Sequence, residues 1–185
     1  MIVVVDGNIG SGKSTLLKNL SRSFNVVTEK IEKWPLEEFY KDPSRWALTL
    51  QIKILQTMTK PSHEMCFHER CLQSSNYVFW KHFFDEGTVS KVENEIYQDL
   101  YKKFEWKSNV YIYLRCSPEK CFENIQKRTQ TGDTAVSMDY LKKIHTKYEE
   151  FIQNIPNVII IDAEQDEKTV YNNVCSIIGC RQSPM

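Results

Sequence analysis

The chain has 185 residues, with 24 Lys+Arg and 24 Asp+Glu, so its formal net charge at pH 7 is zero. This length predicts a single domain over residues 1–185 with a sizeable core. Neutrality gives no support to a duplex-binding protein, which normally carries a basic face, so we expect no nucleic-acid partner. The sequence shows no basic leader and no long apolar stretch, so we expect a cytoplasmic protein with no membrane partner.

Short apolar runs alternate with longer polar segments along the chain. The runs are rich in Val, Ile and aromatic residues, which is typical of strands covered on both faces, and they span 2–6, 25–29, 65–69, 109–114 and 157–162. Helical patterns lie between them at 13–23, 44–60, 70–86, 91–106, 117–130, 136–154 and 166–178. Pro43, Ser117 and Pro118 suit helix starts. The alternation predicts a three-layer α/β fold with a parallel sheet.

The residues at the strand ends carry the first functional signal. In such a sheet, ligands bind at the carboxyl ends of the strands. Four of the five expected ends carry a carboxylate, and the end residues are Asp6, Glu29, Glu69 with Arg70, Arg115, and Asp162 with Ala163. This clustering indicates that Glu29 has a functional role and is not simply a solvated residue of a surface turn.

A phosphate-binding loop follows the first strand. The stretch GNIGSGKS, Gly7 to Ser14, fits G-x-x-x-x-G-K-[ST] between a strand and a helix. Its backbone N–H groups and the helix N-terminus attract phosphate, Lys13 can reach the β- and γ-phosphates, and Ser14 can offer its hydroxyl to Mg²⁺. The expected ATP-binding residues are Gly7, Asn8, Ile9, Gly10, Ser11, Gly12, Lys13, Ser14 and Thr15.

The P-loop alone leaves several classes open. No N-K-x-D follows a later strand, which argues against a guanine-specific GTPase, and no basic face indicates a helicase. A compact kinase for a small acceptor remains.

The six cysteines fall in three C-x4-C pairs, at 66, 71, 116, 121, 175 and 180. Because two of them fall in an expected strand and an expected helix, we interpret them as reduced thiols rather than as a metal site.

Several motifs together resemble the deoxynucleoside kinase family, which includes deoxycytidine, deoxyguanosine and mitochondrial thymidine kinases and the broad-specificity insect enzyme. The matching pieces occur in family order over nearly the whole chain: GNIGSGKST (7–15), TEKIEKW (28–34), YKDPSRWA (40–47), Q (51), HER (68–70), YVF (77–79), IYLRCSPE (112–119) and IDA (161–163). The resemblance implies a P-loop kinase fold with a five-stranded parallel sheet flanked by helices and a short helical lid at about 123–134. It also implies ATP as donor, with Mg²⁺, and nucleotide salvage as the role.

The resemblance implies roles for the strand-end residues. Glu29 would be the general base that accepts the proton of the 5′-hydroxyl. Arg70 would pair with Glu29 and assist the phosphoryl group, and Glu69 would hold the Mg²⁺ water shell beside Ser14. Lys13 and Arg128 would complete the catalytic set, and Asp162 and Ala163 would lie at the ATP site.

The resemblance also implies a nucleoside pocket. Gln51 would pair with the base edge, while Phe79 and Trp34 would stack against it and wall the pocket. Tyr40 and Asp133 resemble the pair that bonds the 3′-hydroxyl, so dideoxy analogues should be poor substrates. Ile54, Met58 and Ser75 fall where relatives tune specificity, and these uncharged residues favour thymidine, with deoxycytidine tolerated.

The sequence departs from the family in two places. Relatives place several arginines in the lid, where this chain has Lys127 and Arg128 with Asn124, Gln126 and Gln130. Arg128 is therefore the main candidate for neutralising transition-state charge. Cys71 stands where a serine is usual.

Two other functions are compatible with a P-loop, and the resemblance also implies an assembly state. A nucleoside monophosphate kinase of the thymidylate type would need basic residues for the acceptor phosphate. A non-catalytic nucleotide-binding regulator would retain the P-loop without turnover, and the presence of Glu29, Arg70, Arg128 and Asp133 argues against it. The resemblance implies a homodimer formed by the helices near 44–60 and 70–86.

Overall fold

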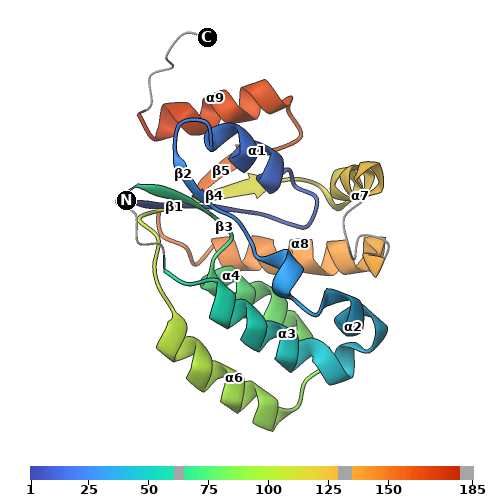
Figure 1. The fold of residues 1–185 in the computed structure, drawn as a ribbon. Helices are drawn as coiled ribbons and strands as arrows, with labels where there is room; N and C mark the ends of the chain where they lie inside the picture. Colours follow the sequence, from blue (N-terminus) through green and yellow to red (C-terminus); the bar gives the residue numbers. More distant parts are fainter. Residues whose placement is uncertain (61–64, 129–134, 180–185) are drawn as a thin grey trace.

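A computed structural model describes residues 1–60, 65–128 and 135–179. It contains a five-stranded sheet, and Figure 1 shows helices flanking this sheet. The strands lie in the order β2-β3-β1-β4-β5, and every pairing is parallel. Their bounds are β1 (Ile2–Asp6), β2 (Asn25–Val27), β3 (Cys66–Glu69), β4 (Val110–Arg115) and β5 (Ile159–Asp162). The predicted α/β fold is confirmed. Because all strands run the same way, their carboxyl ends meet at one edge of the sheet.

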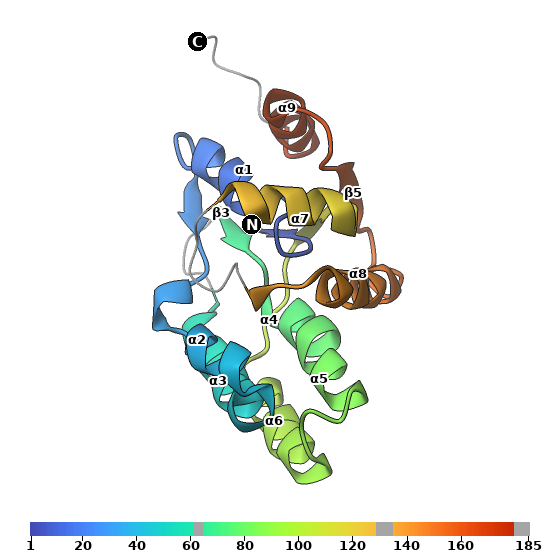
Figure 2. The same ribbon diagram turned by 90° about the vertical axis from the view of Figure 1, so that its right-hand side faces the viewer.

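Helices cover both faces of the sheet. Figures 1 and 2 show α1 (Lys13–Leu20) and α9 (Glu167–Ile177) on one face, and α3 (Pro43–Thr57) and α8 (Met138–Ile152) on the other. Successive side chains of β1 alternate between the two layers: Val3 and Val5 pack in the cluster under α1 and α9, and Val4 packs in the opposite cluster. Burial on both faces explains why the strand sequences are almost continuously apolar.

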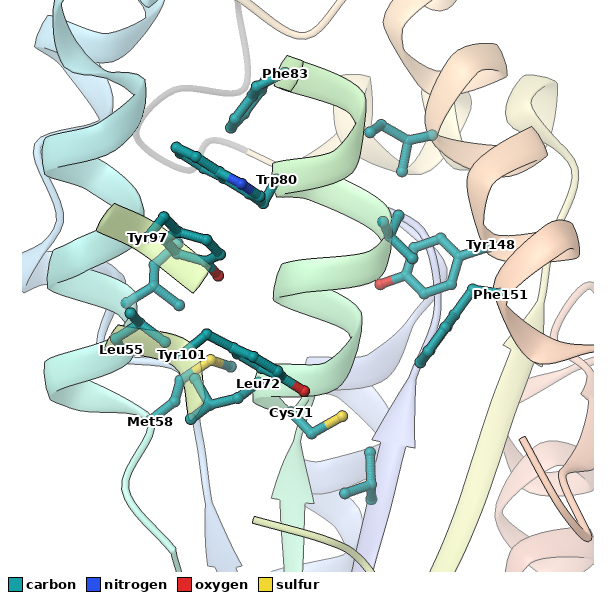
Figure 3. Close-up of a cluster of buried hydrophobic side chains, with 14 of the residues drawn as sticks. Leu55, Met58, Cys71, Leu72, Trp80, Phe83, Tyr97, Tyr101, Tyr148 and Phe151 are labelled. Carbon is teal, nitrogen blue, oxygen red and sulfur yellow. The ribbon is translucent and has the colours of Figure 1, made fainter. Parts of the chain in front are cut away.

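An aromatic core fills the layer below the sheet. Trp80 and Tyr97 belong to it (Figure 3), and their rings stack with centroids 4.1 Å apart. Tyr97 comes from α6 (Lys91–Phe104), whose N-terminus carries a capping box formed by Ser90 and Glu93. Trp80 Nε1 donates to Asn94 Oδ1 over 2.7 Å, so the buried indole is satisfied. This cluster accounts for much of the 12% aromatic content.

The predicted helix at 70–86 is not one regular helix. It begins as α4 (Leu72–Ser74), continues as the π-helix η2 (Ser75–Trp80) and ends as α5 (Lys81–Asp85). The chain leaves β3 through Arg70, whose φ of 60° lies in the left-handed region, so no helix can begin there. A π-helical segment depends on tertiary packing, which the apolar pattern of the sequence does not show.

Two short elements were not predicted, and one strand is shorter than expected. The chain after β2 forms the 3₁₀ turn η1 (Ile31–Lys33) and the helix α2 (Leu36–Lys41). β2 ends at Val27, so Glu29 follows the strand end by two residues instead of closing it. Both features lie along the edge where the strand ends gather.

The segment expected as a lid is described only in part. The helix α7 (Pro118–Lys127) begins after Ser117, whose hydroxyl accepts from Lys120 N, and Arg128 is its C-cap. Gln130 and Asp133 lie outside the described residues. The five described cysteines are free and buried. Of the helices that the structure describes, none has the length and apolarity needed to cross a membrane.

Candidate functional site

The loop Gly7–Gly12 wraps the space between β1 and α1. Gly10 and Gly12 have φ values of 83° and 89°, which L side chains rarely adopt. A Cβ on Gly10 would lie 2.4 Å from the carbonyl oxygen of Cys121, so α7 packs directly on the loop. The predicted P-loop therefore has the backbone conformation that its glycines require, and the N-terminus of α1 faces the space that phosphates would occupy.

Lys13 lies folded against the loop. Its Nζ donates to Gly7 O over 2.9 Å and to Asn8 O over 2.8 Å. Burial lowers the pKa of Lys13 to about 8, with Arg70 contributing further. The Asn8 side chain points elsewhere, since its Nδ2 donates to Leu141 O over 2.9 Å and ties the loop to α8. A bound phosphate would give Lys13 a stronger acceptor than these carbonyls.

A groove beside the P-loop is lined by the loop, by α7 and by the segment after β5. Its expected members are Gly10, Ser11, Gly12, Lys13, Ser14, Thr15, Arg128 and Ala163. Asp162 is not among the residues that line the groove, although its neighbour Ala163 is. Its carboxylate accepts from Glu164 N over 3.0 Å and so fixes the turn after β5. Lys120, Asn124 and Lys127 of α7 also line the groove.

Two oxygen-bearing side chains meet at the inner end of the groove. Ser14 Oγ donates to Glu69 Oε1 over 2.7 Å, and Glu29 N lies 3.4 Å from Glu69 Oε2. Hydroxyl and carboxylate oxygens are the ligands that Mg²⁺ prefers. The described residues contain no group of three or more His, Cys, Asp or Glu that could hold a metal. Ser14 and Glu69 together offer the oxygen ligands of a cation that takes its other ligands from phosphates and water.

Glu29 and Arg70 form a buried ion pair at the junction of the two strand ends. Arg70 Nε lies 2.7 Å from Glu29 Oε1, and each side chain is 8% exposed. Burial raises the pKa of Glu29, and Arg70 partly opposes that effect. The guanidinium also lies 4.6 Å from the centre of the Phe79 ring. The hydrogen bond from Arg70 Nε thus fixes the direction of the Glu29 carboxylate.

An open cavity begins beside this ion pair, and its interior together with the solvent at its mouth takes up about 880 Å³. The expected residues Trp34, Tyr40, Gln51, Ile54, Ser75, Phe79 and Arg128 line it, together with Leu36, Phe39, Leu50, Phe83, Val136 and Tyr140, which the sequence did not single out. Arg128 lines the cavity and the groove together, at the place where a transferring group would pass. The cavity has the mixed apolar and polar lining of a small-molecule site.

Two polar side chains define the inner wall of the cavity. Ser75 Oγ donates to Gln51 Oε1 over 2.7 Å, and both residues are buried. Trp34 Nε1 donates to Thr57 Oγ1 over 2.9 Å, so the indole is held as a wall. Gln51 Oε1 already accepts from Ser75, and the amide nitrogen can only donate, so its two protons are the groups that Gln51 can offer to a carbonyl oxygen of a ligand.

The expectation for Met58 is corrected by the structure. Met58 is 2% exposed in the aromatic core and is not among the residues that line the cavity. It follows the last residue of α3, and its carbonyl oxygen accepts from Trp106 Nε1 over 2.9 Å. The partner expected for Tyr40, Asp133, lies outside the described residues.

A third set of residues at the site was not assigned a role from the sequence. Asp6 is fully buried and accepts from Gly7 N, Tyr111 Oη and Tyr148 Oη over 2.8, 2.7 and 2.7 Å. Tyr148 Oη also accepts from Arg70 Nη1. The strand-end position of Asp6 is visible in the sequence, but nothing local marks the two tyrosines as its partners.

Comparison with known proteins gives a consistent result. A family model described as deoxynucleoside kinase matches residues 3–179. Human mitochondrial thymidine kinase 2 is 32% identical over 82% of this chain and 64% of its own length. Deoxycytidine kinase 2 of Gallus gallus is 28% identical over 90% of this chain and 83% of its own length. A structure of deoxyadenosine kinase from M. mycoides with dCMP and dCDP bound superposes with a TM-score of 0.88 at 26% identity, covering 97% of this chain and 98% of that one.

Proposed function

The chain belongs to the deoxynucleoside kinase family of ATP-dependent phosphotransferases, and we propose that its preferred acceptor is thymidine, with deoxycytidine tolerated. The three relatives compared above are named for three different nucleosides, so family membership leaves the acceptor open. The choice among them has to come from this chain's own cavity.

The observation that carries the proposal is the Gln51–Ser75 pair. Gln51 lines the cavity, its amide nitrogen can donate to a pyrimidine carbonyl oxygen, and the second lone pair of its Oε1 can accept from a ring N–H. Thymine offers such a carbonyl and N–H side by side. Among the described lining residues, the charged ones belong to the P-loop, the strand ends and the end of α7: Lys13, Glu29, Glu69, Arg70 and Arg128. The end of the cavity that would hold the nucleoside base is therefore lined by uncharged residues, and these would contact an uncharged edge of the base.

We assign the chemistry to Glu29 as general base. Its carboxylate lies where the cavity meets the P-loop, so an acceptor hydroxyl there could pass its proton to Glu29 as the oxygen attacks phosphorus. Arg70 orients that carboxylate, and Lys13 and Arg128 lie where charge develops on the transferring group. Lys13 and Arg70 are buried, and the low polarity around them strengthens the effect of their charges.

Ser14 and Glu69 would hold Mg²⁺ in this scheme. The ion, when bound with ATP, neutralises charge on the phosphates. The Glu69 carboxylate would orient water on the ion, and its contact with Glu29 N links the metal site to the base.

A homodimer is the proposed assembly. The support is the apolar surface left on the segment expected at the interface, where Tyr77 of η2 is 49% exposed and Phe84 of α5 is 40% exposed. Light scattering should give about twice the mass of one chain. Tyr77→Glu should shift the protein towards the monomer if this face forms the contact.

The deciding experiment is a panel of four deoxynucleosides with ATP and Mg²⁺. We expect thymidine to have the highest kcat/KM and deoxycytidine the second highest. If deoxyguanosine has the highest value, the assignment of the cavity is wrong. Thymidine is also compared with its monophosphate, because a monophosphate kinase would turn over only the latter.

A further inference from the structure

The Arg70 side chain has a second buried contact that the proposed chemistry does not use. Besides Glu29, its guanidinium donates through Nη1 to the phenol oxygen of Tyr148. Tyr148 is fully buried and lies on α8, 78 residues further along the chain. It is therefore placed by the packing of α8 on the sheet, and not by the strand end that carries Arg70.

The direction of each hydrogen bond in this contact is fixed by chemistry. A guanidinium can only donate, and a carboxylate can only accept. The single phenol proton of Tyr148 goes to Asp6 Oδ1 over 2.7 Å, which turns the oxygen lone pairs towards Arg70. The chain of contacts runs from Glu29 through Arg70 and Tyr148 to Asp6, whose Oδ1 also accepts from Gly7 N at the start of the P-loop.

The alternative position for the guanidinium lies close by. Arg70 Nη1 is 3.7 Å from Asp6 Oδ1, which is ion-pair range without direct hydrogen-bond contact. Without the phenol oxygen between them, the guanidinium would be drawn towards the fully buried Asp6 carboxylate. Such a shift would pull Arg70 Nε away from Glu29.

We infer that Tyr148 is a positioning residue for phosphoryl transfer, which holds the Arg70 guanidinium between Asp6 and Glu29 so that Glu29 keeps the orientation of a base. The inference rests on the proposed role of Glu29. Tyr148 itself contacts no reacting atom in this scheme, and it acts through Arg70. The backbone of Arg70 has independent anchors, because its N donates to Val5 O over 2.9 Å and its O lies 2.8 Å from His68 Nδ1. Only the side chain depends on Tyr148.

Tyr148→Phe is the test, because it removes the hydroxyl and keeps the ring. The ring stacks on Tyr113 with centroids 5.5 Å apart and meets the edge of Phe79 at 6.1 Å, and both contacts survive the change. We expect kcat to fall about 10- to 100-fold, since a small misplacement of a catalytic group has effects of that order. The nucleoside KM should change less than about threefold, because no ligand-facing group is altered.

Two matched variants separate positioning from general loss of structure. Tyr113→Phe removes a hydroxyl from the stacked partner, whose own bond goes to Glu149, and should leave kcat within about twofold. Tyr111→Phe removes an equal 2.7 Å hydrogen bond to Asp6 without touching Arg70. If Tyr111→Phe lowers kcat as much as Tyr148→Phe does, the effect comes through Asp6 and the inference is wrong.

A spectroscopic measurement keeps the test independent of turnover. In protein labelled with ¹⁵N-arginine, the Arg70 Nε–H should be protected from exchange because it is buried and bonded to Glu29. We expect Tyr148→Phe to abolish this protection and Tyr113→Phe to retain it. Retained protection in Tyr148→Phe overturns the inference. If the protection behaves as expected but no deoxynucleoside is phosphorylated by the unaltered protein, the proposed function fails while the positioning of Arg70 stands.

Discussion

Ser75 Oγ donates to Gln51 Oε1 over 2.7 Å, and this hydrogen bond between η2 and α3 decides which face of the Gln51 amide meets a ligand. Both side chains are buried at the wall of the cavity. A buried amide held in this way is pre-organised, so a base that matches it binds without first ordering the side chain.

Removal of the Gln51 amide should weaken nucleoside binding. We expect Gln51→Leu to raise the thymidine KM about 10- to 100-fold, the effect of two lost hydrogen bonds, and Ser75→Ala to raise it less. Steady-state kinetics at saturating ATP measures both. Ser74→Ala is the control, because Ser74 is also buried but donates to Cys71 O and does not line the cavity. An unchanged KM in Gln51→Leu would contradict the assignment.

Substitution of Glu29 should stop turnover and spare binding. Glu29→Gln keeps the shape of the side chain and removes its basicity, so we expect kcat to fall about 100- to 10,000-fold, the range of general-base catalysis. Nucleoside affinity, measured by calorimetry, should change little. The exposed Glu32 gives a matched Glu→Gln control with no loss of rate. Full activity of Glu29→Gln would exclude Glu29 as the base.

ATP binding should be linked to proton uptake by Lys13. Because burial lowers the pKa of Lys13 to about 8, part of the free protein has a neutral Lys13 above that pH, and the phosphates of ATP should raise the pKa again. ATP affinity should therefore fall as pH rises through about 8. Calorimetry in buffers of different ionisation enthalpy should show proton uptake by Lys13 at about pH 8.5, which lies above its pKa. It should show none at about pH 6.5, where Lys13 is already protonated before ATP binds. Equal uptake in Lys13→Arg would assign the proton to another group.

Activity should depend on Mg²⁺ through Glu69. Chelation with EDTA should abolish turnover, and Glu69→Gln should raise the Mg²⁺ concentration for half-maximal rate about tenfold or more, as loss of an orienting carboxylate does at other metal sites. Glu149→Gln is the control, because Glu149 pairs with the strand-end residue Arg115 away from Ser14. Identical Mg²⁺ titrations of the two variants would count against a metal role for Glu69.

Gly10 should not tolerate a side chain. In Gly10→Ala the new Cβ meets the backbone oxygen of Cys121 at 2.4 Å at a φ of 83°, so we expect lost ATP binding and about 1–3 kcal/mol of destabilisation. Gly87→Ala separates strain from clash: its φ is 69°, but nothing lies within 4 Å of the added Cβ. Thermal unfolding and ATP titration of both variants measure the difference. Intact ATP binding in Gly10→Ala would contradict the packing of α7 on the loop.

The sequence predicts the elements that are continuous and strongly patterned. All five strands are found within two residues of their expected ends, because buried parallel strands need unbroken apolar runs. The helix α2 was not predicted because it is only six residues long and begins directly after Pro35. β2 ends early because Thr28 and Glu29 leave the sheet, and the buried contact of Glu29 with Arg70 is invisible in a local pattern.

The residues of the candidate site also fall into those that the sequence predicts and those that it does not. The P-loop is predictable because the motif specifies its own backbone shape, and Ser14 with Glu69 follows from strand-end geometry. Met58 does not line the cavity because it lies just beyond the end of α3, where its side chain packs in the aromatic core, and the apolar pattern of the sequence does not show where that helix ends. Tyr148 was missed because its partner Asp6 lies 142 residues away, and a buried tyrosine has the same helical spacing as its aliphatic neighbours.

The π-helix η2 has a consequence for how this chain is aligned with others. A π-helix has more residues per turn than an α-helix, so η2 contains more residues than an α-helix with the same number of turns. Ser75 and Phe79 line the cavity, while Trp80 bonds to Asn94 on the opposite side. Deleting one residue here would turn everything after it by about 100° and exchange the two sides. Relatives of different length in this segment are therefore matched by helix face, because a gap placed one residue away pairs a cavity residue with a core residue.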